Sequence, residues 1–552
     1  MFEGINTTWT KFKGQEKIQR LIDDCLKQFN LQAPENSISS LVAIYRQIQT
    51  LDDSNENLHY WKQQKLKETE TLLLACSGLW LEASTADYIG ISGQDVAITA
   101  QIVSRNKGTV KLNSISYLQS DTTTALNLNP NELYTFKRKE KLSSSLPFSN
   151  PYWLNQKHEI GLYTVNNADL IGKPENESAT KVVFNLSILD LNLKIERPLV
   201  YKFTDPVKGE IYRPFEILPP ATVNSPEKVF VFTDVTPKTI SITVKANAAN
   251  TNGKLELKGG AGWNISIKNP EFKLVNKGDE ASIEVTIVAD KNAKDGQLQA
   301  SVVINNFSYN KCIKRIEYDH IPYQFILSNA DAGLVNIDLK KTGTTIGYIP
   351  GAGDDVPSCL KQIGYNVTVL TDELLINGNL SQYNAIVSGV RAYNTNDRLQ
   401  VHYPKLMEYV NNGGNLIVQY NTNNRIGPVK ANIGPYSFTI SRDRVTDEKA
   451  NIVFSNEKHS VLNFPNQITQ KDFDGWIQER GIYFATEIDK QYETIFSMKD
   501  PNEKASDGSL IIGKYGKGNF VYTGLVFFRE LPAGIPGAYR LFVNLLSLPE
   551  NK

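Results

Sequence analysis

The chain has 552 residues, of which 41% are hydrophobic and 10% are aromatic. This composition is sufficient for several packed domains and excludes an intrinsically disordered protein. Basic and acidic residues both number 59, so a formal net charge of zero leaves no basic surplus for binding nucleic acid or an anionic membrane.

Four cysteines are spread over the chain and none forms a C-x-x-C pair, so neither a zinc ribbon nor a redox motif is predicted. No apolar run approaches the roughly 18 residues of a membrane-spanning helix. The N-terminal stretch "MFEGINTTWTKFKGQ" lacks the charged-then-apolar layout of a signal peptide. We therefore expect no membrane span, and either a cytoplasmic protein or part of a larger one.

Residues 15–82 have the pattern of amphipathic helices. Apolar side chains recur at spacings of three and four within 18–29, 38–48 and 58–76, which places each set on one helix face. The sequence therefore predicts a helical segment over residues 1–84.

Alternating apolar residues predict β-structure over the next part of the chain. "QDVAITAQIVSRN" and "VVFNLSILDLNL" alternate in the first part, and "KTISITVKA" and "ASIEVTIVAD" do so in the second. We expect an antiparallel β-sandwich over 85–218 and an immunoglobulin-like sandwich over 219–332. The proline-rich stretch 205–227 has the composition of a linker between them.

Strands alternating with helices predict an α/β domain over residues 333–552. The strand-like runs are "TIGYIP", "NVTVLT", "YNAIVSG" and "NLIVQYNT", and helical patterns lie between them. Such alternation is typical of a parallel sheet with right-handed crossovers. The predicted fold class is therefore multidomain α and β: a helical segment, two antiparallel sandwiches and a flavodoxin-like α/β domain.

The carboxyl ends of the strands in this last domain form the candidate site, because open α/β sheets bind ligands at that edge. Aromatic, amide and charged side chains that can stack on and hydrogen-bond to a sugar follow several of the predicted strands. The candidate pocket residues are Asp354, Asp355, Arg391, Tyr393, Tyr420, Asn421 and Arg425. The loop containing Phe528 lies at the same predicted edge.

The stretch "TIGYIPGAGDD" (345–355) resembles a phosphate-binding loop, but it lacks the required lysine. Its two carboxylates would repel phosphate and instead suit a helix N-terminus, so a strand-to-helix turn is the favoured interpretation. H-E-x-x-H pairs and G-x-S-x-G or G-x-C-x-G elbows are absent from the sequence. We therefore assign no catalytic residue and no metal ligand.

Several stretches together resemble the long bacterial PIG-L (LmbE-like) family of deacetylases. The resemblance spans nearly the whole chain. The stretches are "FEGINTTW", "NPYWL", "GLYTV", "DPVKGEIYRP", "EYDHIP", "ISRDRVTDE", "GWIQERGIYF" and "FFRELPAGIPGAYRLF".

The resemblance implies a zinc-dependent catalytic domain that hydrolyses an N-acetyl group on a sugar, followed by β-sandwich modules and a class I glutamine-amidotransferase-like domain. The H-P-D-D zinc motif of the catalytic domain is absent here, and the last domain lacks the nucleophilic cysteine of amidotransferases. The chain is thus expected to correspond to the non-catalytic C-terminal region, with zinc only in the missing domain.

Three hypotheses follow. In the first, the chain binds a glycan or amino sugar, positions substrate for the deacetylase domain, or holds an oligomer together. In the second, the last domain is a sugar-active hydrolase that uses Asp354, Asp355 and Arg391. In the third, the pocket is vestigial and the chain is purely structural. The family resemblance also allows a periplasmic or extracellular location.

Overall fold

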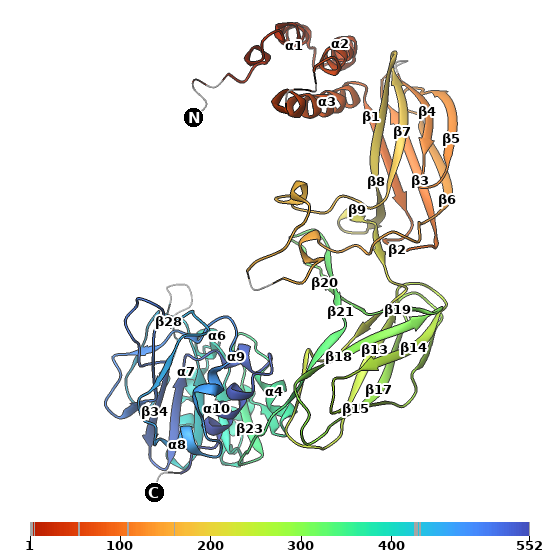
Figure 1. The fold of residues 1–552 in the computed structure, drawn as a ribbon. Helices are drawn as coiled ribbons and strands as arrows, with labels where there is room; N and C mark the ends of the chain where they lie inside the picture. Colours follow the sequence, from red (N-terminus) through yellow and green to blue (C-terminus); the bar gives the residue numbers. More distant parts are fainter. Residues whose placement is uncertain are drawn as a thin grey trace.

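A computed structural model of the chain describes residues 4, 6–52, 54, 56–106, 110–158, 161–423, 429 and 432–550. Figure 1 shows a helical region at the N-terminus, then two β-rich domains, then an α/β domain at the C-terminus. The predicted multidomain, β-rich architecture with a short N-terminal helical segment is confirmed. No helix among the described residues is both long enough and apolar enough to cross a membrane.

Three main helices form the N-terminal region: α1 (Glu16–Gln28), α2 (Ile38–Gln49) and α3 (Glu56–Cys76). The predicted helical stretch is too long, because α3 ends at Cys76 and β1 begins at Leu79. Gly78 adopts a φ of 58°, a left-handed conformation that commonly terminates helices.

One hydrophobic cluster unites the helices with the first β-rich domain. Ile18 of α1 and Leu73 of α3 belong to the same cluster as Ile98, Leu112 and Phe184 of the strands. The helices therefore pack against one end of this domain (Figure 1), and the two regions share one hydrophobic cluster.

An eight-stranded sheet forms the first β-rich domain, in the order β5-β4-β7-β8-β1-β3-β6, with β9 paired to β8. The long strand β8 joins two parts of the sheet: its first half pairs with β7, and its second half pairs with β1 and β9. The strands are β1 (Leu79–Thr85), β3 (Asp95–Ser104), β4 (Val110–Ser116), β5 (Asp121–Asn127), β6 (Leu133–Lys141), β7 (Lys181–Ile188), β8 (Leu191–Asp205) and β9 (Gly209–Pro214).

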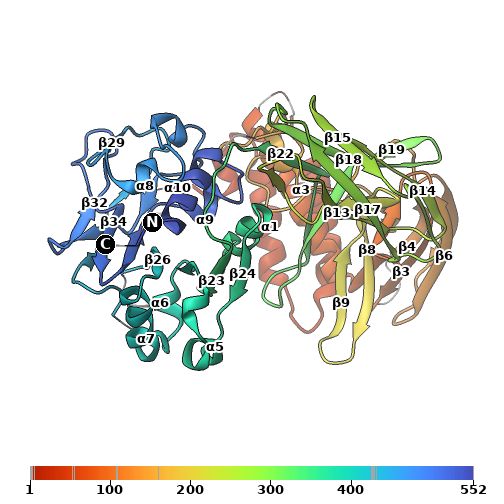
Figure 2. The same cartoon turned by 90° about the horizontal axis from the view of Figure 1, so that it is seen from below.

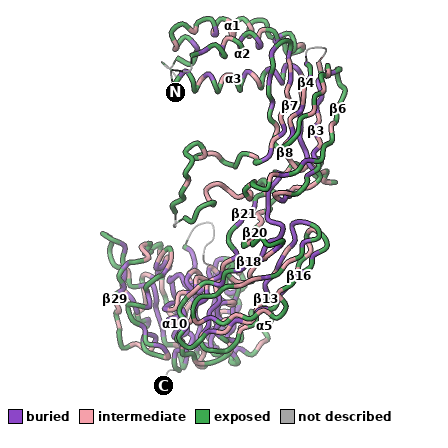
Figure 3. Tube along the Cα trace, turned by 45° about the vertical axis from the view of Figure 1, so that its right-hand side comes forward, coloured by how far each residue is buried: buried purple, intermediate pink, exposed green. Residues whose placement is uncertain are grey.

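A long segment between β6, which ends at Lys141, and β7, which begins at Lys181, lies outside the sheet. Figure 3 shows it as a mainly exposed or half-buried stretch, in contrast to the purple interiors of the domains. It contains the short 3-10 helices Tyr152–Leu154 and Ala168–Leu170.

The proline-rich stretch 205–227 is part of the folded domains, so the prediction of a linker is wrong. It contains β9, β10 (Glu216–Leu218) and β11 (Ala221–Asn224), and β10 pairs in parallel with β2 (Ile89–Ile91). Residues 215–223 are all buried. Its prolines lie at strand ends and between strands, where no ladder hydrogen bond is lost.

Two sheets enclose one hydrophobic core in the second β-rich domain. Val244 and Val285 come from the sheet β11-β13-β17-β15, and Val302 and Leu334 come from the sheet β12-β22-β18-β14-β16. The strands are β12 (Val229–Phe232), β13 (Lys238–Ala246), β14 (Thr251–Lys258), β15 (Trp263–Ile267), β16 (Glu271–Leu274), β17 (Glu280–Ala289), β18 (Gly296–Ile304), β19 (Phe307–Tyr309) and β22 (Asp331–Asn336). The hairpin β20 (Lys311–Ile316) and β21 (Gln324–Asn329) projects from this domain toward the first one (Figure 1).

A seven-stranded sheet forms the centre of the C-terminal domain, in the order β24-β23-β25-β26-β35-β34-β32. The first five strands in this order are parallel, and β34 and β32 continue the sheet antiparallel. The strands are β23 (Thr345–Ile349), β24 (Asn366–Val369), β25 (Ala385–Ser388), β26 (Asn415–Gln419), β32 (Tyr492–Thr494), β34 (Leu510–Tyr515) and β35 (Gly518–Thr523).

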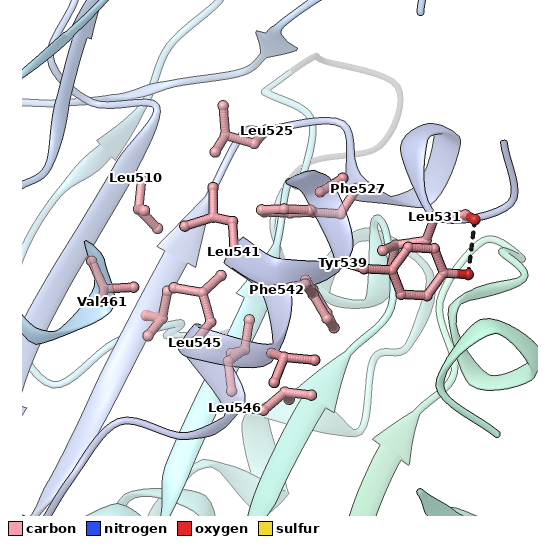
Figure 4. Packing of buried hydrophobic residues seen from close by; sticks show 14 of the residues in the cluster. Val461, Leu510, Leu525, Phe527, Leu531, Tyr539, Leu541, Phe542, Leu545 and Leu546 are labelled. Atoms are coloured by element: carbon pink, nitrogen blue, oxygen red, sulfur yellow. Dashed lines mark hydrogen bonds between the residues drawn. The ribbon is translucent and has the colours of Figure 1, made fainter. Parts of the chain in front are cut away.

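Helices cover both faces of this sheet (Figure 2). On one face α4 (Val356–Gln362), α8 (Ser460–Asn463), α9 (Phe527–Glu530) and α10 (Pro536–Leu546) share a hydrophobic cluster. On the other face lie α5 (Asp372–Asn377), α6 (Ala392–Thr395) and α7 (Leu399–Asn411). Figure 4 shows α10 packed through Leu541, Phe542 and Leu545, while the Tyr539 hydroxyl donates to the Leu531 carbonyl.

Short strand pairs complete the domain between β26 and β34. They are β27 (Thr439–Ile440) with β31 (Ala485–Thr486), β28 (Arg444–Val445) with β30 (Gly481–Ile482), and β29 (Ile452–Phe454) with β33 (Phe496–Met498). These pairs position residues 474–484 close to the carboxyl ends of the parallel strands, since Gly481 also forms a bridge with Leu525 just after β35.

Candidate functional site

The turn after β23 is in direct backbone contact with the turn after β25. Ala352 N–H donates to the Val390 carbonyl at 2.8 Å, and Gly389 N–H donates to the Ile349 carbonyl at 2.8 Å. A Cβ atom at Gly351 would lie 2.1 Å from the Val390 oxygen. The first glycine of "PGAGDD" is therefore required by this close approach of two backbones.

Asp354 braces this pair of turns. Its Oδ1 accepts from Val356 N–H and its Oδ2 accepts from Val390 N–H, both at 3.1 Å. Asp355 is the N-cap residue of α4 and its side chain is exposed. Burial and the nearby Asp354 charge raise the pKa of the Tyr348 hydroxyl, which keeps that phenol neutral. The stretch is thus a strand-to-helix turn whose first aspartate links two neighbouring loops.

Amide side chains join the turn after β25 to the turn after β26. Asn421 Oδ1 accepts from Tyr393 N–H at 2.9 Å, and its Nδ2 donates to the Gln419 carbonyl at 3.1 Å. Asn394 and Thr422 add a reciprocal pair of hydrogen bonds at 3.0 and 2.8 Å. Tyr393 and Asn421 are both 0% exposed, so they support the loops from beneath and do not line an open surface.

Three aromatic rings gather above these loops. Tyr420 stacks on Tyr483 with ring centroids 5.6 Å apart and planes 16° from parallel. Phe528 lies 5.4 Å from Tyr420 at 53°. All three side chains are half-buried, so the rings keep solvent-facing surface at the carboxyl edge of the sheet.

Two arginines and one glutamate surround these rings. The backbone N–H of Arg391 donates to the backbone carbonyl of Tyr420 at 2.8 Å, and Arg529 Nε lies 3.2 Å from Glu479 Oε1. Burial raises the pKa of the Tyr420 hydroxyl, while the Arg391 and Arg529 charges act in the opposite direction. We call the set Arg391, Tyr420, Glu479, Tyr483, Phe528 and Arg529 the edge cluster.

The loops that build the edge cluster contain strained backbone. Arg391, Gln478 and Tyr483 have φ values of 58°, 65° and 60°, in the left-handed region that non-glycine residues rarely adopt. Within the described part of the chain, Arg391 Nε is buried without a hydrogen-bond partner. Such strained and unsatisfied groups are typical of functional sites, where surrounding packing holds them in place.

Glu530 lies behind the cluster with its side chain completely buried. Both of its carboxyl oxygens lie 3.1 Å from Ile477 N–H, so it anchors the segment that supplies Glu479. Burial raises the pKa of the Glu530 carboxyl to about 8, although that N–H and the charges of Arg480 and Arg529 lower it.

The structure brings together only part of the predicted pocket. Arg391 and Tyr420 meet in the edge cluster, whereas Asp354 braces the turns and Asp355 faces solvent. Arg425 lies outside the described residues. Glu479 and Arg529 are not among the predicted pocket residues. They come from segments about fifty residues apart, and no local motif marks them as partners.

A hollow of about 590 Å³ lies at the opposite edge of the same sheet. Residues at the amino ends of β23, β25 and β26, among them Thr342, Asn384 and Asn415, contribute to its lining. Asn415 Nδ2 donates to the Leu548 carbonyl at 2.8 Å, so this amide ties down the C-terminal tail. None of the predicted site residues lines this hollow. Among the described residues, no group of three or more His, Cys, Asp or Glu side chains is arranged to hold a metal ion.

Comparison with known proteins adds structural neighbours of low similarity. No protein-family model matches the chain, and no curated protein matches it. A FixG-related protein from Vibrio parahaemolyticus aligns with 22% of this chain and 98% of its own, at 14% identity and a TM-score of 0.16. Native E. coli alpha-2-macroglobulin aligns with 47% of this chain and 17% of its own, at 9% identity and a TM-score of 0.17. Red sea bream transglutaminase aligns with 52% of this chain and 34% of its own, at 11% identity and a TM-score of 0.21.

Proposed function

We propose that the chain is the non-catalytic accessory region of a PIG-L family N-acetyl-sugar deacetylase and binds a glycan at the edge cluster. In this proposal the β-rich domains are sandwich modules, and the last domain is a flavodoxin-like, amidotransferase-like domain. The catalytic domain and its zinc would come from outside this chain, and the bound glycan would be held for that domain.

The strand order supports the flavodoxin-like assignment. The five parallel strands follow the order second, first, third, fourth, fifth along the chain, as in doubly wound sheets of that class. The connection from β23 to β24 passes over one face of the sheet through α4, and the connection from β24 to β25 passes over the other face through α5. A ligand crevice is expected outside the carboxyl ends of the two adjacent strands where the strand order reverses, here β23 and β25. Arg391, on the turn after β25, stands at this position.

The stacked pair Tyr420–Tyr483 beside Arg391 is the observation that carries the binding proposal. A sugar ring presents apolar C–H faces that pack on an aromatic ring, and hydroxyl groups that hydrogen-bond to guanidinium and carboxylate groups. The edge cluster provides both kinds of group on strained loops tied together by Asn421 and Asp354.

Tyr420→Ala and Arg391→Ala are each expected to weaken binding of N-acetylated amino-sugar oligomers by at least about fivefold, since a central contact residue contributes more than about 1 kcal/mol. Isothermal titration calorimetry measures this. Tyr163→Ala is the matched control, because Tyr163 is 50% exposed and lies in the segment between β6 and β7. This variant should bind the glycan like the wild type. Unchanged affinity in both edge-cluster variants would show that the glycan does not bind there.

A second candidate, a sugar-active hydrolase, is favoured by one observation: the Glu479 carboxylate lies 3.2 Å from Arg529 Nε at the carboxyl edge of the sheet, and such a carboxylate–arginine pair can take part in acid–base catalysis. If it applies, the wild type should hydrolyse some member of a panel of N-acetyl sugars, assayed with and without added divalent metal, and Glu479→Gln should abolish that turnover. Glu373→Gln on α5, an acidic residue at the other face of the sheet, is the control. Absence of wild-type turnover would remove the support for catalysis.

A further inference from the structure

A polar cluster lies where the two β-rich domains meet. The first domain contributes Tyr88, just before β2, and Arg213 on β9, and the second contributes Tyr323, just before β21. The Arg213 guanidinium carbon is 3.9 Å from the ring centroid of Tyr88 and 3.5 Å from that of Tyr323. Arg213 is therefore stacked between two tyrosines, one from each domain.

Two further cations approach the same tyrosines. Arg315 Nη1 donates to the Tyr323 hydroxyl at 2.6 Å. Lys277 Nζ lies 4.5 Å from the Tyr88 ring centroid and forms an ion pair with Asp87 across the junction. Beneath these groups, an apolar cluster that includes Ile89 and Phe325 joins the domains. The cluster thus lies at a packed interface that both domains build.

Hydrogen-bonding groups at this junction lack partners. Arg213 Nε and Nη2 are buried and have no hydrogen-bond partner among the described residues, and the same holds for Glu216 Oε2. Glu216 is only 5% exposed. Buried polar atoms are almost always paired in folded proteins, so a group that the chain itself does not supply is expected here.

The charges at the junction indicate which kind of group is missing. Lys277 is compensated by Asp87, whereas Arg213 and Arg315 form no ion pair with another described residue. Burial raises the pKa of the Glu216 carboxyl to about 8, although the charges of Arg213 and Arg315 lower it, so Glu216 carries little negative charge at neutral pH. A water molecule would satisfy the hydrogen bonds but would add no negative charge beside the two arginines.

We propose that the junction binds a small oxyanion, a carboxylate or a phosphate group, at the guanidinium group of Arg213 and the carboxyl group of Glu216. The planar fork of Arg213 matches a two-oxygen acceptor, and its Nε and Nη2 are the two donors that remain free. The protonated Glu216 carboxyl can donate to the same ion. Bound there, the ion would lie between β9 and β10 of the first domain, beside Tyr323, which immediately precedes β21 of the second.

Isothermal titration calorimetry of the full chain with sodium phosphate, and separately with sodium acetate, tests this at neutral pH and constant ionic strength. One ion should bind per chain, and the two titrations show whether a phosphate or a carboxylate is preferred. Arg213→Met should weaken binding at least about tenfold, as expected for loss of a charge-assisted bidentate contact. Arg138→Met, an exposed arginine on β6 of the same domain, should have no effect.

Two further variants keep the test decisive if Arg213→Met perturbs folding. Arg213→Lys retains the charge but not the fork, and should bind with intermediate affinity. Glu216→Gln is neutral like the protonated acid, and should retain binding at neutral pH. The proposal is overturned if neither anion binds, or if the folded Arg213→Met or Arg213→Lys protein binds as tightly as the wild type.

Discussion

Replacing Asp472 by alanine should destabilise the C-terminal α/β domain by about 2–3 kcal/mol, because it removes the buried partner of an ion pair together with its hydrogen bonds to Thr469. Asp472 is 4% exposed, and its Oδ1 accepts from Arg540 Nε of α10 at 2.6 Å. Its Oδ2 accepts from Thr469 N–H at 2.7 Å and from the Thr469 hydroxyl at 3.0 Å. The substitution therefore removes a helix cap and leaves the Arg540 guanidinium without its carboxylate.

Urea unfolding monitored by hydrogen exchange of peptides from the C-terminal domain measures this effect separately from the β-rich domains. Asp474→Ala is the matched control, since Asp474 lies two residues away on the same segment and is exposed. We expect the control to stay within about 0.5 kcal/mol of the wild type. Equal unfolding free energies for the two variants would contradict the stabilising role assigned to the Asp472–Arg540 pair.

Replacing Gly351 by alanine should cost about 2–3 kcal/mol and should also weaken glycan binding. The added Cβ would lie 2.1 Å from the Val390 oxygen and 2.9 Å from the carbonyl carbon of Gly389, both backbone atoms that cannot rotate away. The turns after β23 and β25 must then separate, which displaces Arg391 from its place beside Tyr420.

The same urea and calorimetric measurements apply to this variant. Ala352→Ser is the control, because Ala352 is the next residue of the turn and is exposed. It should leave both stability and binding close to wild type. If Gly351→Ala had no effect on stability, the two turns would not be in the close backbone contact described above.

Hydrophobic periodicity was sufficient to predict where the main elements lie. The alternation around Ile98 and Phe184 predicted strands that do form, and the spacing from Ile18 to Phe29 predicted a helix. The misassigned positions have local physical causes. Apolar residues continue past Cys76, but the left-handed conformation of Gly78 ends the helix there. Residues 205–227 have the proline content of a linker, although residues 215–223 are buried and form β-strands.

The candidate site was only partly accessible to sequence reasoning. Topology placed Arg391 and Tyr420 at one sheet edge, because both follow parallel strands. The same reasoning treated Tyr393 and Asn421 as equivalent, although both are completely buried and brace the loops. Exposure at a turn depends on how neighbouring loops pack over each other, and that information is not local.

The sequence by itself determined the order of domains, the alternation of strands and helices in the last one, and the strand-to-helix turn at Gly351 to Asp355. These follow from side-chain periodicity and from the conformations that each residue type permits. Only the tertiary structure decided that Glu479 and Arg529 join Tyr420, and that Arg213 is held between tyrosines of two domains. Contacts between distant segments depend on chain closure and core packing, because a residue's own neighbours do not specify which remote side chain it will meet.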